Sequence, residues 1–177
     1  PQAEKIEIKW PNDLVWKGKK CCGILLESKL AGDKVENKNE VPLKKIPLVL
    51  GIGINVNSTD LENDLSLQGN AVSLQTIAAK PIDRVLLLKQ IIIAVDQYYA
   101  QLNDALPDLS ALKKEWLSKY KSRSSLLGRG LTLQMGNQNF QGIAKDIDAQ
   151  FGLVVELKNG LSQVFRAENT TLLSQNE

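Results

Sequence analysis

The sequence predicts an α+β protein in which a mixed β-sheet with helices is followed by a small β-barrel. Strand patterns fill the first third of the chain, two amphipathic helical patterns follow, and strand patterns separated by turn signals return near the C-terminus. The expected domains are residues 1–122 and 129–177. In a chain of 177 residues, a hydrophobic content of 43% suffices for a core and excludes wholesale disorder.

Charge and residue types exclude several classes of function. The net charge of +2 lacks the strong basic bias of a dedicated nucleic-acid binder. The absence of histidine excludes Ser-His-Asp catalysis, Cys-His catalysis and His-ligated zinc within the chain. The two cysteines, Cys21 and Cys22, are adjacent and fit packing in a reducing cytoplasm rather than a disulfide framework. The apolar run at residues 91–95 is too short to cross a bilayer, so no membrane partner is expected.

The N-terminal part predicts strands and one hairpin. Residues 5–10 alternate apolar and polar side chains, and Pro11-Asn12-Asp13 ends this strand with turn-forming residues. Residues 14–16 and 21–28 are the expected arms of a hairpin. The remaining expectations are a loop at 31–45, a buried strand with two glycines at 46–56, and a loop at 58–70.

The second half predicts two helices and a barrel. Asp83 is the expected N-cap of a helix that reaches Leu102, because apolar side chains recur at steps of three and four. A second helix is expected at about 109–120, and a basic, Ser-rich linker at 121–130. Four short strands then predict an SH3-like barrel, at 131–135, 140–146, 153–157 and 163–166.

Three motifs contain residue types that suit a binding site. Asn12 and Asp13 end a strand, where their oxygens could bind Mg²⁺ or orient an amine; a turn capped by its own side chains is the alternative. Lys20 enters an apolar strand and could direct its ammonium at an anion, whereas a solvated hairpin end is the alternative. Gly51 and Gly53 interrupt a strand, which indicates that a ligand or another strand approaches the backbone.

In this order, the three motifs resemble those of the biotin protein ligases. The matching runs are Lys-Trp-Pro-Asn-Asp-Leu at 9–14, Lys-x-x-Gly-Ile-Leu-x-Glu at 20–27 and Gly-Ile-Gly-Ile-Asn-Val-Asn at 51–57. The resemblance implies a domain of the type shared with class II aminoacyl-tRNA synthetases. It also implies a cytoplasmic enzyme that uses biotin, ATP and Mg²⁺ to form biotinyl-5′-AMP. A lysine of a biotin carrier domain, such as that of acetyl-CoA carboxylase, then accepts the biotinyl group.

The resemblance implies roles for individual residues. Lys20 is the implied catalytic contact to the biotin carboxylate and the α-phosphate, with Asn12 and Asp13 as further catalytic residues near the phosphates, Mg²⁺ or the amine. Asn55 and Asn12 are the implied nucleotide-binding residues, and Asn12 and Asp13 the implied metal ligands. The implied biotin pocket consists of Lys20, Gly23, Ile24, Leu25, Gly51 and Ile54.

The chain departs from the family at both ends. The family has a Gly-Arg-rich loop upstream of the first motif, whereas only nine residues precede Trp10 here. We therefore expect the C-terminal part of a ligase, inactive alone, with exposed apolar edges that favour strand exchange or a homo-oligomer. DNA binding is expected only of an N-terminal domain that this chain lacks. At the other end, no arginine follows Leu172 and Leu173, where the family commonly has one.

Two alternatives to a biotin ligase stay open. One is a lipoate or octanoyl ligase of related fold, and the other is a non-catalytic binding module left by degeneration of a ligase. The lipoate and octanoyl ligases usually lack the Lys-Trp-Pro-Asn-Asp run of the first motif, and Lys20 with the glycines of the expected pocket argues against degeneration.

Overall fold

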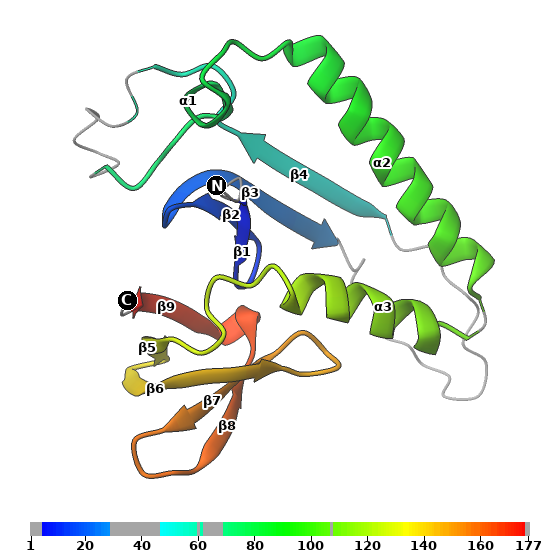
Figure 1. Cartoon of the computed structure of the whole chain (residues 1–177). Coiled ribbons are helices and arrows are strands. Elements are labelled where there is room, and N and C mark those ends of the chain that lie inside the picture. Colours follow the sequence, from blue (N-terminus) through cyan, green and yellow to red (C-terminus); the bar gives the residue numbers. More distant parts are fainter. Residues whose placement is uncertain (1–4, 29–46, 60, 62–68, 107, 176–177) are drawn as a thin grey trace.

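The computed structural model describes residues 5–28, 47–59, 61, 69–106 and 108–175, and this part of the chain is an α+β structure. Its strands form a four-stranded sheet of order β1-β2-β3-β4 and a five-stranded sheet of order β8-β7-β6-β5-β9. In Figure 1 the four-stranded sheet lies between helix α2 and the five-stranded sheet. No helix of the described residues is long and apolar enough to cross a membrane.

The four-stranded sheet is entirely antiparallel and contains β1 (Glu7–Lys9), β2 (Asp13–Trp16), β3 (Lys19–Ser28) and β4 (Leu48–Ile54). The predicted hairpin is confirmed, and positive φ angles at Lys17 (50°) and Gly18 (77°) suit the tight turn that joins its arms. The loop expected at 31–45 and most of the loop expected at 58–70 lie outside the described residues.

The strand predicted at 46–56 is present as β4, but the prediction that it is buried is wrong. Leu48, Val49 and Leu50 are 61%, 64% and 45% exposed. β4 stands at the end of the strand order, and no described strand pairs with its outer edge. An apolar strand is buried only where other elements cover it, so composition alone overestimates burial here.

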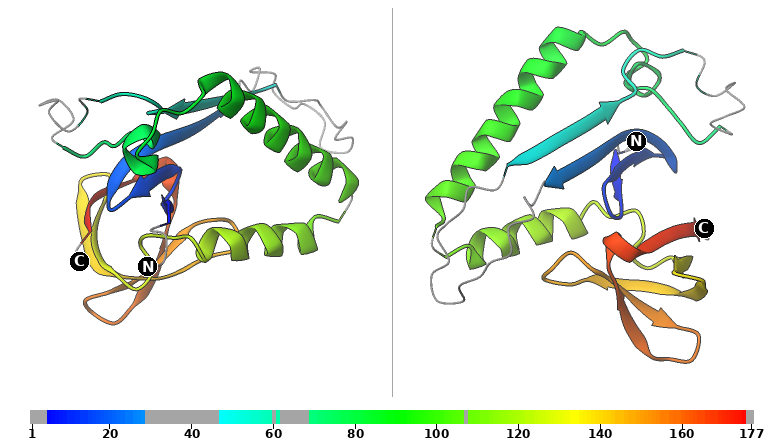
Figure 2. Two further views of the ribbon diagram at one scale, coloured as in Figure 1. Left: turned by 45° about the horizontal axis from the view of Figure 1, so that its top comes forward. Right: turned by 180° about the vertical axis from the view of Figure 1, so that it is seen from behind.

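Three α-helices follow β4 in the described part of the chain: α1 (Leu74–Ala78), α2 (Arg84–Asp104) and α3 (Ser110–Lys121). The predicted cap is confirmed, because Asp83 Oδ1 accepts hydrogen bonds from the backbone N–H groups of Val85 (2.8 Å) and Leu86 (3.0 Å). α2 runs alongside β4 in Figures 1 and 2. The short helix α1 was not predicted, because five residues are too few to show helical periodicity.

The C-terminal sheet contains β5 (Gly130–Met135), β6 (Gln138–Ile147), β7 (Leu153–Leu157), β8 (Ser162–Phe165) and β9 (Thr170–Gln175), all antiparallel. The four predicted strands are found, and β9 was missed. Leu133, Val155 and Phe165 are fully buried in its core. The expected SH3-like barrel is not confirmed, because within the described residues the strand order ends at β8 and β9 without pairing between them.

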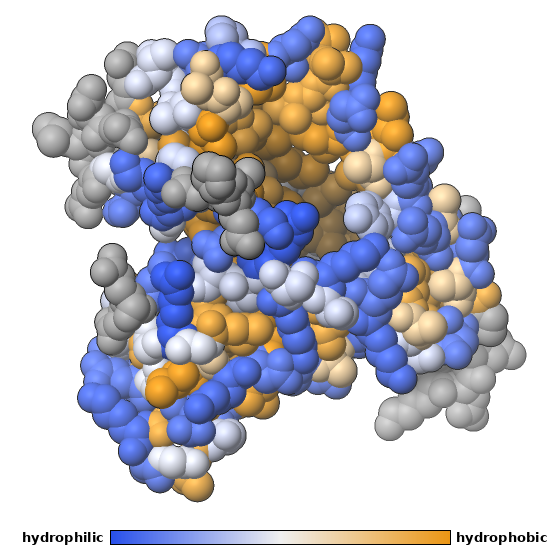
Figure 3. All heavy atoms as spheres, viewed as in Figure 1, coloured by the Kyte–Doolittle hydropathy of each residue, from blue (hydrophilic) through white to orange (hydrophobic). Residues whose placement is uncertain are grey.

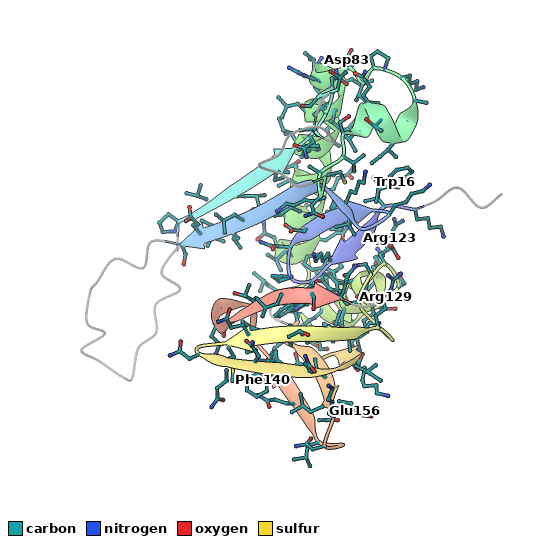
Figure 4. All side chains as sticks on the ribbon, turned by 90° about the vertical axis from the view of Figure 1, so that its left-hand side faces the viewer. Trp16, Asp83, Arg123, Arg129, Phe140 and Glu156 are labelled. Carbon is teal, nitrogen blue, oxygen red and sulfur yellow. The ribbon has the colours of Figure 1, made fainter. Side chains whose placement is uncertain are left out.

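The segment predicted as a linker, residues 121–130, is a packed connector, and that prediction is wrong. Leu126 is fully buried in the core of the C-terminal sheet. Backbone hydrogen bonds tie the segment to β1, from Ile8 N–H to Arg123 O (2.7 Å) and from Ser125 N–H to Ile8 O (2.8 Å). Figure 4 shows Arg123 where the two sheets meet. A few buried side chains and backbone pairing with a neighbouring strand therefore fix a segment whose overall composition is polar.

Candidate functional site

The site begins with an irregularity in the β2–β3 hairpin. Val15 pairs with Lys20, but Leu14, the residue before Val15 in β2, pairs with Cys22. Cys21 is therefore the extra residue of a β-bulge. Both Cys21 and Cys22 are buried, at 1% and 5% exposure, although adjacent residues of a regular strand face opposite sides.

The bulge brings three of the candidate residues to one face of the sheet. Lys20 and Gly23 are three positions apart, so a regular strand would direct them to opposite faces. With the extra residue between them, both share the face of Asp13, which pairs with Gly23. Lys20 Nζ lies 2.6 Å from Asp13 Oδ1. The bulge therefore allows Lys20, Gly23 and Asp13, which are separated in the sequence, to lie together on one face.

Gly23 makes room for this ion pair. A Cβ atom at Gly23 would lie 2.9 Å from Lys20 Nζ and 3.3 Å from Asp13 Oδ1. The Lys20 side chain therefore crosses directly over the backbone of Gly23. The side chains of Lys20 and Asp13 are 51% and 28% exposed, so the pair remains accessible to a ligand.

A groove of about 610 Å³ surrounds the pair. Asn55 lines it, and its backbone N–H donates to Cys21 O (2.9 Å) while its side-chain Nδ2 approaches Lys20 O at 3.4 Å. Gly53, opposite Gly23 in β4, contributes a second stretch of bare backbone. Sequence reasoning gave no site role to several lining residues, among them Lys9, Val15, Gly18, Asn70, Ala71 and Leu173. Nothing local in the sequence marks Leu173, which comes from the distant strand β9.

Asn12 is held against β3 and does not line the groove. Its side-chain Nδ2 donates a hydrogen bond to Ile24 O, and the N–H of Ile24 donates to Asn12 O (3.0 Å). Asn12 thus bonds both backbone groups of Ile24, one through its side chain and the other through its own backbone carbonyl. This arrangement orients the turn that leads into Asp13.

The other residues expected in the biotin pocket divide between two faces. Leu25 pairs with Gly51, and both lie farther along the face that holds Gly23. Ile24 and Ile54 lie on the opposite face, where they pack around the buried residues Cys21, Cys22 and Val72. The structure therefore brings Asp13, Lys20, Gly23 and Asn55 together in the groove and places Ile24 and Ile54 behind it.

A second hollow, of about 730 Å³, lies between β4 and α2. Its lining is mainly apolar, with Ile52 and Ile54 from the sheet and Leu87, Ile91 and Val95 from the helix. Figure 3 shows apolar side chains gathered over this part of the molecule. The expected exposed apolar surface is therefore present. The smaller groove is the better candidate site because it also contains a cation, a carboxylate and an amide.

The two thiols of the groove are not set up as nucleophiles. Burial raises the pKa of Cys21, and the neighbouring Cys22 raises it further. Burial and the charge of Asp13 raise the pKa of Cys22, while Lys20 opposes this shift. Both side chains are free thiols and remain protonated at neutral pH. Their burial fits a packing role.

A metal ion would need ligands beyond the side chains of this groove. Among the described residues, no group of three or more His, Cys, Asp or Glu side chains is placed to hold one. Asp13 is the single carboxylate that lines the groove in the described part of the chain.

No family model matches the chain. The similar curated proteins and the similar solved structures are both biotin ligases. The bifunctional ligase/repressor BirA of Bacillus subtilis is 28% identical over 162 residues, which are 92% of this chain and 45% of that protein. The biotin–[acetyl-CoA-carboxylase] ligase of Mycobacterium tuberculosis is 29% identical over 158 residues, 89% of this chain and 49% of that protein. This chain thus spans less than half the length of either relative.

A solved structure shows the same fold. The biotin protein ligase from Aquifex aeolicus, in complex with biotin and ATP, matches with a TM-score of 0.67 and 24% sequence identity. The match covers 94% of this chain and 61% of that chain.

Proposed function

We propose that this chain, a relative of the biotin protein ligases in sequence and in fold, provides the lysine-bearing part of a site that activates biotin. The single observation that carries the proposal is the ammonium of Lys20, held over Gly23 beside Asp13 in a groove that Asn55 also lines. The motifs that contain these residues are the ones whose order resembles the ligases.

The proposed first step joins two anions. An oxygen of the biotin carboxylate attacks the α-phosphorus of ATP, a new P–O bond forms, and the bond to the bridging oxygen breaks as pyrophosphate leaves. The ammonium of Lys20 offsets the negative charge of both partners, which is the main obstacle to their approach. This reaction depends on positioning and charge more than on acid–base catalysis, so a chain without histidine suits it.

The remaining groove residues have supporting roles in this proposal. Asn55 contacts the nucleotide, Asp13 orients Lys20, and Asp13 is also the residue that would hold a Mg²⁺ ion. Magnesium commonly binds one or two carboxylates together with substrate phosphates, so the single carboxylate of Asp13 would be enough to hold the ion when ATP is bound. Bound there, Mg²⁺ would offset phosphate charge. The position of Asn12 against Ile24 favours a role in orienting the turn over direct contact with nucleotide or metal.

In the proposed second step, a lysine amine of a biotin carrier domain attacks the carbonyl of biotinyl-5′-AMP, and AMP leaves as the amide bond forms. The names of the relatives point to the carrier domain of acetyl-CoA carboxylase as the acceptor. Free, adjacent cysteines support a cytoplasmic setting for this reaction.

The proposed organisation has two domains, residues 1–122 and 129–177, the second of SH3-like type. We also propose that further polypeptide completes the catalytic site, because Leu25, Leu26 and the apolar residues of β4 are exposed. The same surface would allow two copies to associate or exchange strands. A monomeric mass by light scattering at micromolar concentration would argue against such association.

Biotin-dependent exchange of pyrophosphate into ATP tests the proposed function. The assay is run on this chain and on the longest chain that its gene encodes, with lipoate and octanoate in place of biotin as controls. Exchange that requires biotin supports the proposal. Exchange with lipoate or octanoate instead would favour the related ligases. Absence of both exchange and biotin binding in both chains would favour a non-catalytic binding module.

A further inference from the structure

We infer that α3 and the C-terminal sheet are positioning elements for the candidate site, because they hold the turn at Trp10–Asn12 that leads into Asp13. The structural part of this inference stands on its own contacts. Its consequence for nucleotide binding rests on the proposed function.

Trp10 belongs to the core of the C-terminal sheet. It is 2% exposed and packs in the same buried cluster as Leu133 and Phe165. Its indole Nε1 donates a hydrogen bond to Phe151 O (2.9 Å), in the turn between β6 and β7. The first residue of the turn is thus fixed both by packing and by a polar contact to the C-terminal sheet.

Tyr120 of α3 holds the next residue of the turn. Its hydroxyl donates to Pro11 O (2.8 Å), and its ring meets Phe151 edge to face, with ring centroids 5.7 Å apart. Burial raises the pKa of Tyr120 well above its usual value, so the hydroxyl keeps its proton and remains a donor at physiological pH. One side chain therefore connects α3, the C-terminal sheet and the turn.

Asn12, the third residue of the turn, connects the turn to the groove. Asn12 is bonded to both backbone groups of Ile24, and Asp13 follows it directly. Asp13 in turn holds Lys20 Nζ at 2.6 Å. A displacement of the turn would shift the carboxylate that orients the lysine. Tyr120 does not line the groove, so it acts through the turn and is a positioning residue.

The test compares Tyr120→Phe with the matched variant Tyr99→Phe. Tyr120→Phe removes the hydroxyl that reaches Pro11 but keeps the ring that packs on Phe151. Tyr99 lies on α2 and is 62% exposed, so its variant makes the same chemical change away from the turn. Hydrogen exchange is measured by NMR at the Ile24 amide, which bonds to Asn12, and at the Ala144 amide, which bonds to Arg129 within the C-terminal part. Binding of Mg-ATP is measured by calorimetry.

We expect Tyr120→Phe to speed exchange at Ile24 by about three- to tenfold with no change at Ala144, and to weaken Mg-ATP binding by a similar factor. Tyr99→Phe should change none of these quantities. Unchanged exchange at Ile24, equal acceleration at Ile24 and Ala144, or faster exchange with unaltered Mg-ATP affinity would each overturn the inference. If the unsubstituted chain and the longest chain of its gene bind no Mg-ATP, the proposed function fails, and exchange at Ile24 alone decides whether α3 holds the turn.

Discussion

Replacing Gly23 with alanine should separate the stability of the fold from the function of the groove. The added Cβ would lie 2.9 Å from Lys20 Nζ and 3.0 Å from Lys20 Cε. To regain ordinary van der Waals contact, which begins at 3.4 Å, the ammonium must move by about 0.5 Å. The atoms that move are the far end of a flexible, half-exposed side chain, so the backbone need not shift.

The expected cost to stability is small. An ion pair of this exposure contributes about 1 kcal/mol or less. Alanine also restricts the unfolded chain more than glycine does, which stabilises by about 0.4–1 kcal/mol and offsets part of the loss. The melting temperature should therefore change by less than about 4 °C in a chain of this size.

The expected cost to function is much larger. A charge displaced from the position of the reacting phosphate loses transition-state stabilisation, and comparable displacements cost about tenfold to hundredfold in rate. We expect that loss in biotin-dependent ATP–pyrophosphate exchange by the longest chain of the gene.

The control variants decide whether Lys20 transmits the effect. Gly53→Ala adds a methyl group to the same groove, but its nearest neighbour is Gly23 O at 3.9 Å, so the ion pair should persist. If Gly23→Ala acts through the lysine, the double variant with Lys20→Ala should be no less active than Lys20→Ala alone. Additive losses in the double variant, or full activity of Gly23→Ala, would refute the reasoning.

Three further predictions concern single groups. Lys20→Ala should lower exchange activity at least about hundredfold and leave the melting temperature nearly unchanged, because a half-exposed lysine adds little core volume; a large drop in melting temperature would show a structural role. Cys21 and Cys22 should react with iodoacetamide at pH 7 at least about tenfold more slowly than free cysteine, since burial raises their pKa; a rate equal to that of free cysteine would contradict this. Burial alone would raise the pKa of Asp148, but hydrogen bonds from Arg166 and the backbone hold it below its usual value. Its stabilising contribution is therefore present at neutral pH and lost below about pH 4, and Arg166→Gln should flatten the acid dependence of the urea midpoint.

Features set by neighbouring residues could be predicted from the sequence. The cap at Asp83 uses only the next three residues of the chain, and the hairpin turn depends on Lys17 and Gly18. Lys20 and Asp13 were identified as candidate residues from their motifs, and the structure places them in contact.

Features set by distant contacts could not be predicted in this way. The run Lys20 to Gly23 has the pattern of a regular strand, and only its pairing with β2 shows the bulge. β9 pairs with β5 across some 35 residues of chain, and its own alternation is weak. The burial of Leu126 and the exposure of β4 likewise depend on which elements lie beside them.

The bulge at Cys21 makes the site depend on how β3 pairs with β2, as well as on which residues β3 contains. A small or apolar replacement of Cys21 would preserve the spacing, and Lys20 would still reach over Gly23. Loss of Cys21 would leave Lys20 and Gly23 two positions apart, and a regular strand directs such residues to the same face. Loss of the bulge with every residue kept would instead turn Lys20 and Gly23 to opposite sides of the sheet. A substitution that makes the pairing of β2 with β3 regular would therefore disable the site without changing any residue that lines it.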